Sequence, residues 1–403
     1  MTGSEGMKGD AMTPERVVLI LALLLGLQPV TTDLYLPGLP ALTTELQGTV
    51  NQAQLTLSGL LLSFGLSQLV FGPVSDRVGR RPVLLVGLSL YGVAAIGSCQ
   101  ASSMESLLFW RILQGAALGA GVVCARAVVR DLYTPAFGAQ ILSRGLSGLG
   151  VIACLSLPLG GALAHWFGWR AALLAVSLFG IATLVVIFRS FRETLARPDP
   201  EALQPRKLLK TWAKVLRHRR FWAFALVAAC TYGGLFTFLA SSSFVFIELL
   251  GVSRLLYGVM MFSMAFAYLL GTYLCRALLR RFSLQNTVAL GGVFSLAGGT
   301  LMGGLSLAGI ESVAGILLPI WIFMLGHGIL QPCGQAGAVG PFPEAAGAAS
   351  ALSGCLMMVL AFGMGQWLGW QADGTAVPMT MGIWFWSAVT ALVAWGLVRP
   401  QSQ

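Results

Sequence analysis

Residues 72–82 of the chain read GPVSDRVGRRP, a short segment that carries one acid, three arginines and helix-breaking residues. It separates an apolar run near 54–74 from another near 83–102. Each run is long enough to cross a lipid bilayer, which takes roughly 20 apolar residues. A charged segment between two such runs is typical of a tight loop at a membrane surface.

The same alternation of apolar runs and short polar segments extends over the whole chain. Only 10% of the 403 residues are charged, and the mean hydropathy is +0.80; soluble domains carry about 25% charged residues. The sequence therefore predicts an all-α membrane protein with twelve transmembrane helices. The ten remaining runs lie near 17–37, 107–129, 139–165, 171–190, 221–246, 255–275, 284–308, 312–336, 346–370 and 377–398.

The two halves of the chain resemble each other. Arg276, Arg280 and Arg281 follow the eighth run, the place that residues 72–82 occupy after the second. Duplication of this kind is typical of secondary transporters, whose substrate site lies between the halves. We expect two pseudo-symmetric six-helix bundles, with the following division: a cytoplasmic tail at 1–15, a bundle at 16–190, a basic cytoplasmic linker at 191–220 suited to anionic lipid headgroups, and a bundle at 221–399.

The distribution of basic residues predicts the orientation. With twelve spans and both termini inside, the outer loops hold only Arg170 and Arg254, and Arg111 lies within a span. All other Lys and Arg residues fall on or near the inner side, as the positive-inside rule expects. The formal net charge of +10 therefore reflects the orientation of the chain in the membrane, and we expect no nucleic-acid partner.

Asp33 is the first candidate functional residue, because an ionisable group within a span is costly and marks a functional site by default. It lies about 25 Å along the first helix from Arg16, and Arg111 lies about 9 Å into the fourth from the other side. We expect both at similar depth on helices beside one cavity. Burial disfavours a charged carboxylate and a nearby arginine favours it, so a proton and a cationic substrate could compete there.

Further polar side chains inside spans are candidates for the cavity wall. Gln114 lies one turn beyond Arg111 on the same helix face. His327, Gln331 and Gln335 form a polar stripe on the tenth helix, and Tyr232 lies within the seventh. Interhelical hydrogen bonds are the alternative for the stripe and for Tyr232, whereas Gln114 could contact substrate.

The sequence lacks the residue patterns that a metal site, an enzyme or an ATP-driven transporter would need. The seven cysteines lie in apolar stretches without metal-ligand spacing, and the three histidines are far apart, so we expect neither a metal site nor an enzyme. No Gly-rich phosphate-binding loop is visible, which argues against direct use of ATP. We expect no cofactor, with a proton gradient as the source of energy.

The segment Gly72 to Pro82 resembles the signature loop of the major facilitator superfamily. Further matching segments are TTDLYLPGLP from Thr31, RILQGAALGAG from Arg111, ARAVVRDLY from Ala125, LPLGG from Leu157 and GWRA from Gly168. Together they resemble the bicyclomycin and chloramphenicol resistance subgroup (Bcr/CflA) of drug–proton antiporters. Leu157 stands where that family has a glycine before the proline.

The resemblance implies roles for three sets of residues. Arg111 would take part in proton coupling. A cytoplasmic gate would be formed by Gly72, Asp76, Arg77, Gly79, Arg80, Arg126 and Arg130. The fifth helix would seal the cavity with Gly150, Pro158, Gly160 and Gly161.

We therefore expect a monomeric proton-coupled exporter of drug-like molecules in the bacterial inner membrane, working by alternating access. A proton-coupled exporter or importer of a purine, amino acid or sugar is the alternative. A membrane enzyme or a channel fits the sequence less well.

Overall fold

A computed structural model describes residues 12–398; most of the expected tail at 1–15 and residue 399 lie outside this range. Within it, twelve helical spans are long and apolar enough to cross a membrane, and no strand occurs. The helices of the first half are α1 (Pro14–Asp33) with η1 (Leu36–Gly38) and α2 (Leu39–Glu45), α3 (Val50–Val78), α4 (Arg80–Cys99), α5 (Met104–Leu132), α6 (Pro135–Trp166) and α7 (Trp169–Ser190). Those of the second half are α9 (Arg219–Ser243) with η2 (Phe244–Leu249), α10 (Arg254–Leu279), α11 (Leu284–Leu307), α12 (Val313–Val339), η3 (Pro343–Ala345) with α13 (Ala346–Trp370), and α14 (Val377–Val393) with η4 (Ala394–Val398).

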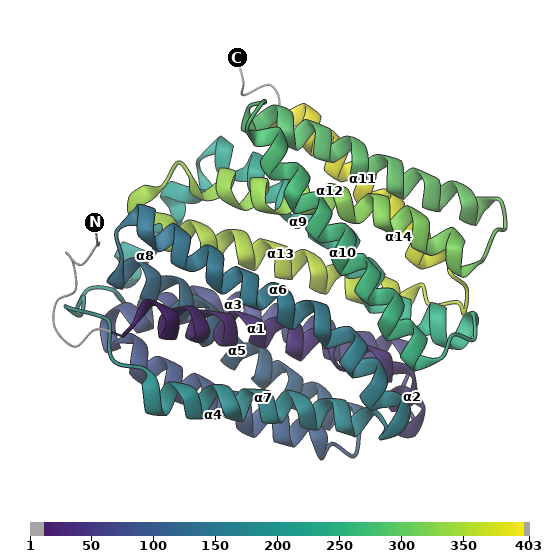
Figure 1. Cartoon of the computed structure of the whole chain (residues 1–403), viewed down its shortest axis with the longest axis horizontal. Coiled ribbons are helices and arrows are strands. Elements are labelled where there is room, and N and C mark those ends of the chain that lie inside the picture. The colour runs from purple at the N-terminus through teal and green to yellow at the C-terminus, as the bar shows by residue number, and fades with distance from the viewer. Residues whose placement is uncertain (1–11, 399–403) are drawn as a thin grey trace.

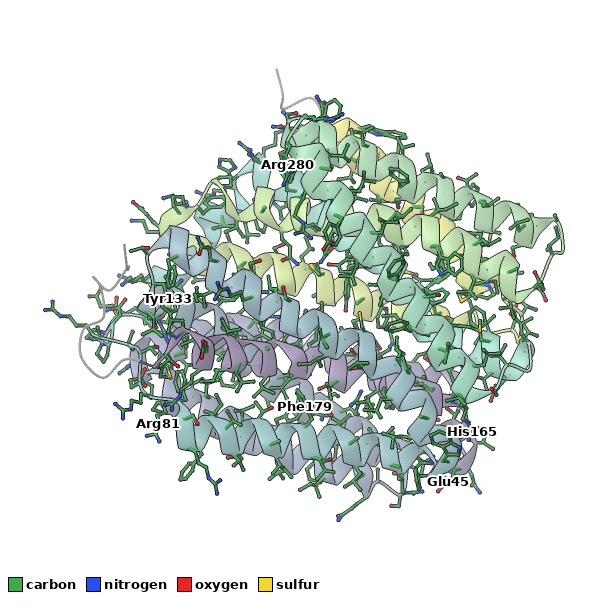
Figure 2. The ribbon with its side chains drawn as sticks, in the orientation of Figure 1. Glu45, Arg81, Tyr133, His165, Phe179 and Arg280 are labelled. Atoms are coloured by element: carbon green, nitrogen blue, oxygen red, sulfur yellow. The ribbon has the colours of Figure 1, made fainter. Side chains whose placement is uncertain are left out.

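The spans form two bundles side by side, which confirms the expected fold class. In Figure 1 the purple-to-teal helices α1 to α7 lie below and the green-to-yellow helices above, with α13 against the lower bundle. Figure 2 separates the two ends of the molecule: Arg81 and Tyr133 lie at one, Glu45 and His165 at the other. We call these the Arg81 end and the Glu45 end.

The first span, Pro14–Glu45, is broken about two-thirds of the way along. Helix α1 ends at Asp33, and the chain passes through η1 before resuming as α2. Pro37 and Pro40 lie in this stretch, and a proline has no backbone N–H with which to continue a helical ladder. The break places Asp33 at a helix end inside the protein.

The bundles share a long contact between α3 and α13. A Cβ added to Gly369 would lie 2.2 Å from Asn51 Oδ1, one on Gly365 would lie 2.6 Å from Ser58 Cβ, and one on Gly65 would lie 2.6 Å from Met358 Cβ. These contacts follow α3 over several turns. Small residues allow such close approach of two membrane helices.

Helices α6 and α10 meet over a much shorter length, near the Glu45 end. A Cβ on Gly258 would lie 2.8 Å from the Leu157 carbonyl oxygen, and Arg254 Nη1 donates to the Ala164 carbonyl at 3.2 Å. Toward the Arg81 end, α6 packs on α1 through Gly145, whereas α10 packs on α12 through Gly271. The two helices therefore diverge from right to left in Figure 1.

The segment between the bundles contains a short helix, α8 (Pro205–Leu216). Val215 is buried against the second bundle, while Leu209 is 61% exposed among lysines. The expected basic linker is thus partly a surface helix.

Substitution of Gly258 tests the close α6–α10 contact. We expect Gly258→Ala to lower thermal stability by the equivalent of about 1–3 kcal/mol, the usual cost of overpacking, because the nearest atoms are backbone. Gly304→Ala in α11 is the matched control, since a Cβ there meets nothing within 4 Å. Thermal unfolding of the detergent-solubilised protein measures both; equal midpoints would refute the contact.

Candidate substrate cavity

A cavity of about 470 Å³ lies between the two bundles. Its wall comes from α1, α3, α5 and α6 on one side and from α9, α10 and α12 on the other. Small-molecule sites usually measure about 300–1,000 Å³. The α6–α10 contact closes the cavity toward the Glu45 end, and the divergence of these helices widens it toward the Arg81 end.

Asp33, the first candidate from the sequence, lines this cavity. One face of α1 contributes Leu25, Gln28, Pro29, Thr32 and Asp33, which recur at helical spacing. Thr32 Oγ1 donates to Asp33 Oδ1 at 2.7 Å, and within residues 12–398 no basic side chain forms an ion pair with this carboxylate. The half-buried carboxyl group therefore keeps hydrogen-bonding capacity for a proton or a ligand.

Arg111 does not line the cavity, in contrast to the expectation. It is fully buried behind α1, where Nη2 donates to the Thr31 carbonyl and Nη1 to Gln114 Oε1, both at 2.9 Å. Its guanidinium lies 4.3 Å from the centroid of the Tyr35 ring. A cation at the negative end of a helix dipole is stabilised there, so Arg111 holds the broken end of α1. Its role in proton coupling stays a prediction.

Gln114 is also fully buried and contacts Arg111 instead of the cavity. In this conformation it is placed to orient the arginine, not to touch a substrate. Thr31 and Tyr91 complete the buried polar cluster, with 2.6 Å between their hydroxyl oxygens.

The second bundle contributes the predicted polar wall. Tyr232, His327, Gln331 and Gln335 all line the cavity. His327 Nδ1 lies 3.1 Å from Thr231 Oγ1, and its ring stacks on Phe323. Gln331 Oε1 is buried and has no hydrogen-bond partner in the described part of the chain.

The apolar part of the wall is rich in flexible side chains. Met261, Met264 and Met324 face the same space as Phe236 and Tyr268, a tyrosine that the sequence alone did not single out. Methionine adapts its shape to irregular partners and is common at promiscuous binding surfaces. The wall can therefore accept apolar bodies of different shapes.

A second cluster of charges lies at the Arg81 end, outside the cavity. Arg80 is 2% exposed and joins three helices: Nη1 lies 2.7 Å from Asp76 Oδ1 on α3, and Nε donates to Asp131 Oδ2 on α5 at 2.9 Å. Arg130 Nη2 lies 3.9 Å from Asp76 Oδ1. The network ties together the ends of α3, α4 and α5.

The remaining residues of the expected gate are not part of this ion-pair network. Gly79 has a φ of +108°, which only glycine adopts readily, and a Cβ there would lie 2.5 Å from Glu193 Oε2. Gly72 faces Val123, and Arg77 is exposed without an ion pair among the described residues. Arg126 makes no ion pair with this cluster and lines the substrate cavity.

Sequence reasoning missed Glu193, which follows α7. Its carboxylate accepts hydrogen bonds from the backbone N–H groups of Arg80 and Arg81 at 2.9 and 3.0 Å, and from those of Thr194 and Leu195. Burial raises the pKa of the Glu193 carboxyl, but these four donors lower it more, and the pKa lies below its usual 4.5. Glu193 therefore caps the start of α4, and no local sequence motif predicts this contact.

The residues expected to form the fifth-helix seal lie on α6. Gly160 packs against α1, where a Cβ would lie 2.1 Å from the Leu34 carbonyl oxygen, and Gly161 and Pro158 pack against Gly258 of α10. A Cβ on Gly150 would meet nothing within 4 Å, so this glycine is not required for packing. The contacts of the other three lie where the cavity ends.

Comparison with known proteins gives one consistent family. The sequence profile of the Major Facilitator Superfamily matches residues 21–366. The chain is 31% identical to a chloramphenicol resistance protein of Pseudomonas aeruginosa over 81% of this chain and 77% of that protein. It is 29% identical to multidrug resistance protein D of Escherichia coli over 85% of this chain and 86% of the relative. The crystal structure of a D-xylose–proton symporter shares the fold, with a TM-score of 0.74 at 14% identity over 95% and 97% of the two chains.

Two bundles of membrane helices around a central cavity define a membrane transporter. The chain belongs to the major facilitator superfamily and, within it, to the bicyclomycin and chloramphenicol resistance (Bcr/CflA) subgroup.

Removal of the Glu193 carboxylate tests its capping role. We expect Glu193→Ala to destabilise the start of α4 by about 0.5–2 kcal/mol, the usual cost of losing a helix cap, because the partly buried Arg80 N–H and the exposed Arg81 N–H lose their acceptor. Hydrogen exchange of the Arg80 and Arg81 amides should accelerate accordingly.

Glu201→Ala is the control, since Glu201 is exposed in the same linker and makes only a surface ion pair. Because the folded pKa of Glu193 is depressed, its contribution should be complete above about pH 5 and lost as the pH falls through the folded pKa. Unchanged exchange in Glu193→Ala would refute the cap.

Proposed function

We propose that this transporter is a proton-coupled exporter of drug-like small molecules, located in the bacterial inner membrane and working by alternating access. The observation that carries the proposal is Asp33, a carboxylate in the cavity wall without a basic partner among the described residues. The names of the relatives, which refer to chloramphenicol and to multidrug resistance, support the class of substrate.

The coupling follows from the cost of an unpartnered charge in a cavity. An ionised Asp33 needs a counter-charge or hydrogen-bond donors, which a proton or a donor group of the substrate can supply. When the proton leaves Asp33, binding of the substrate becomes more favourable, and when the substrate leaves, binding of a proton becomes more favourable. Exchange of the two at one group converts a proton gradient into export, without a cofactor.

The basic residues support an orientation with the Arg81 end in the cytoplasm, together with both termini. Arg81 lies at that end in Figure 2, and ion pairs and hydrogen bonds hold Arg80, Arg130 and the linker beside it, as the positive-inside rule requires. The cavity then widens toward the cytoplasm, where a drug is loaded. The outward-facing state requires the α6–α10 contact to open and the bundles to approach at the cytoplasmic side.

Proton movement in inverted membrane vesicles tests this function. Chloramphenicol and a panel of antibiotics and metabolites are added after a proton gradient has formed. We expect at least one antibiotic to collapse the gradient with the wild type, and Asp33→Asn to reduce that response at least tenfold, because the amide cannot carry the proton.

Asp373→Asn is the control, because Asp373 is exposed in the loop before α14. Normal exchange by Asp33→Asn would refute the role of Asp33. A response to metabolites alone would favour a specific metabolite transporter, and no response to any compound would refute proton-coupled exchange.

A further inference from the structure

The cavity carries a second charged residue, Arg126, with no function in the mechanism above. Apart from Asp33 it is the one fully charged side chain among the described cavity residues. It lies on α5 and is solvent-exposed although the helix around it is buried. Arg126 lines the main cavity and two smaller pockets beside it, so its exposed surface faces space inside the protein.

Arg126 has few partners of its own. Nη1 donates to Ser350 Oγ on α13 at 2.6 Å, and no carboxylate within residues 12–398 pairs with it. A guanidinium has five N–H donors, so most of its capacity is left for water or a ligand.

Polar side chains with unused hydrogen-bonding capacity surround Arg126. A smaller lobe of about 140 Å³ joins the main cavity here, and Gln28, Tyr232 and Gln331 line both. Gln331 Oε1 and Ser353 Oγ in this lobe are buried without a hydrogen-bond partner. Buried polar atoms normally have partners, so the lobe offers a ligand two unused positions beside Arg126: the Gln331 amide oxygen, which accepts, and the Ser353 hydroxyl, which can donate.

Arg126 and Asp33 lie at opposite ends of the cavity. Gly121 of α5 packs against Leu24 and Leu27 of α1, which sets the two helices in register. From that level Arg126 lies five residues toward the Arg81 end and Asp33 six residues or more toward the other. At 1.5 Å per residue their backbones are about 15–20 Å apart along the helices. The methionine-rich apolar wall lies between them.

We propose that the cavity selects dipolar molecules, with Arg126 binding an anionic or strongly accepting group, Asp33 a donor or cationic group, and the apolar wall the body between them. This inference rests on the proposed function, since it names the substrate class of the same cavity. It predicts that zwitterions are better ligands than lipophilic cations of the same size.

Binding of a matched pair of compounds tests the selection. Norfloxacin is a zwitterion at neutral pH, and its methyl ester keeps the ring system and the amine but lacks the carboxylate. Affinities are measured by calorimetry on the full chain in lipid nanodiscs, without a proton gradient. We expect the wild type to bind norfloxacin about tenfold more tightly than the ester.

The variants separate recognition from gating. Arg126→Gln should lower the affinity for norfloxacin about tenfold and change the affinity for the ester less than twofold. Only norfloxacin has a carboxylate whose contact with Arg126 is lost. Arg126→Lys should retain part of the preference. Arg276→Gln is the control, since Arg276 is exposed on α10 outside the cavity wall.

Equal weakening of both compounds by Arg126→Gln would show that Arg126 acts on the conformation, and would overturn the proposal. Absence of norfloxacin binding, or binding indifferent to Arg126, would overturn it too. Since no gradient is present, Arg126-dependent binding without proton exchange in vesicles would refute the proposed function alone.

Discussion

Every charge placed among apolar helices needs a partner, and this constraint organises the interior of the protein. The chain meets it in two ways. Arg80 and Arg111 are satisfied by the protein itself, the first by two carboxylates and the second by a helix end and an aromatic ring. Asp33 and Arg126 are left facing open space. Arg80 and Arg111 hold helices in place, whereas Asp33 and Arg126 keep hydrogen-bonding capacity that a ligand can use.

The fold could be predicted from the sequence because lipid imposes a simple rule. A span must be apolar for about 20 residues and must satisfy its own backbone, so runs and loops are visible without any knowledge of packing. Asp33 could be found by the same rule, as a charge within a run.

The neighbours of each side chain could not be predicted, because they depend on how helices are rotated and broken. Arg111 and Arg126 lie fifteen residues apart on α5, about 60° from each other around the helix axis, so they point to the same broad side of the helix. At the level of Arg111 the end of α1 covers that face, and at the level of Arg126 the face is open. Arg126 and Arg130 share a face as well, but only Arg130 reaches Asp76, since it lies in the last turn of the helix. Glu193 could not be found from the sequence because the start of α4, which it caps, is more than a hundred residues away.

The unequal contacts between the bundles have a mechanical consequence. The α3–α13 contact follows α3 over several turns, whereas the close backbone approach of α6 and α10 at Gly161 and Gly258 lies near one surface. As long as this contact is intact, a small tilt of one bundle about it would have a large effect at the other surface of a layer about 30 Å thick. Rotation of one bundle by about 10° around it would move the far ends of α6 and α10 by about 5 Å over that thickness. A few glycines at one end thus govern the width of the opening at the other.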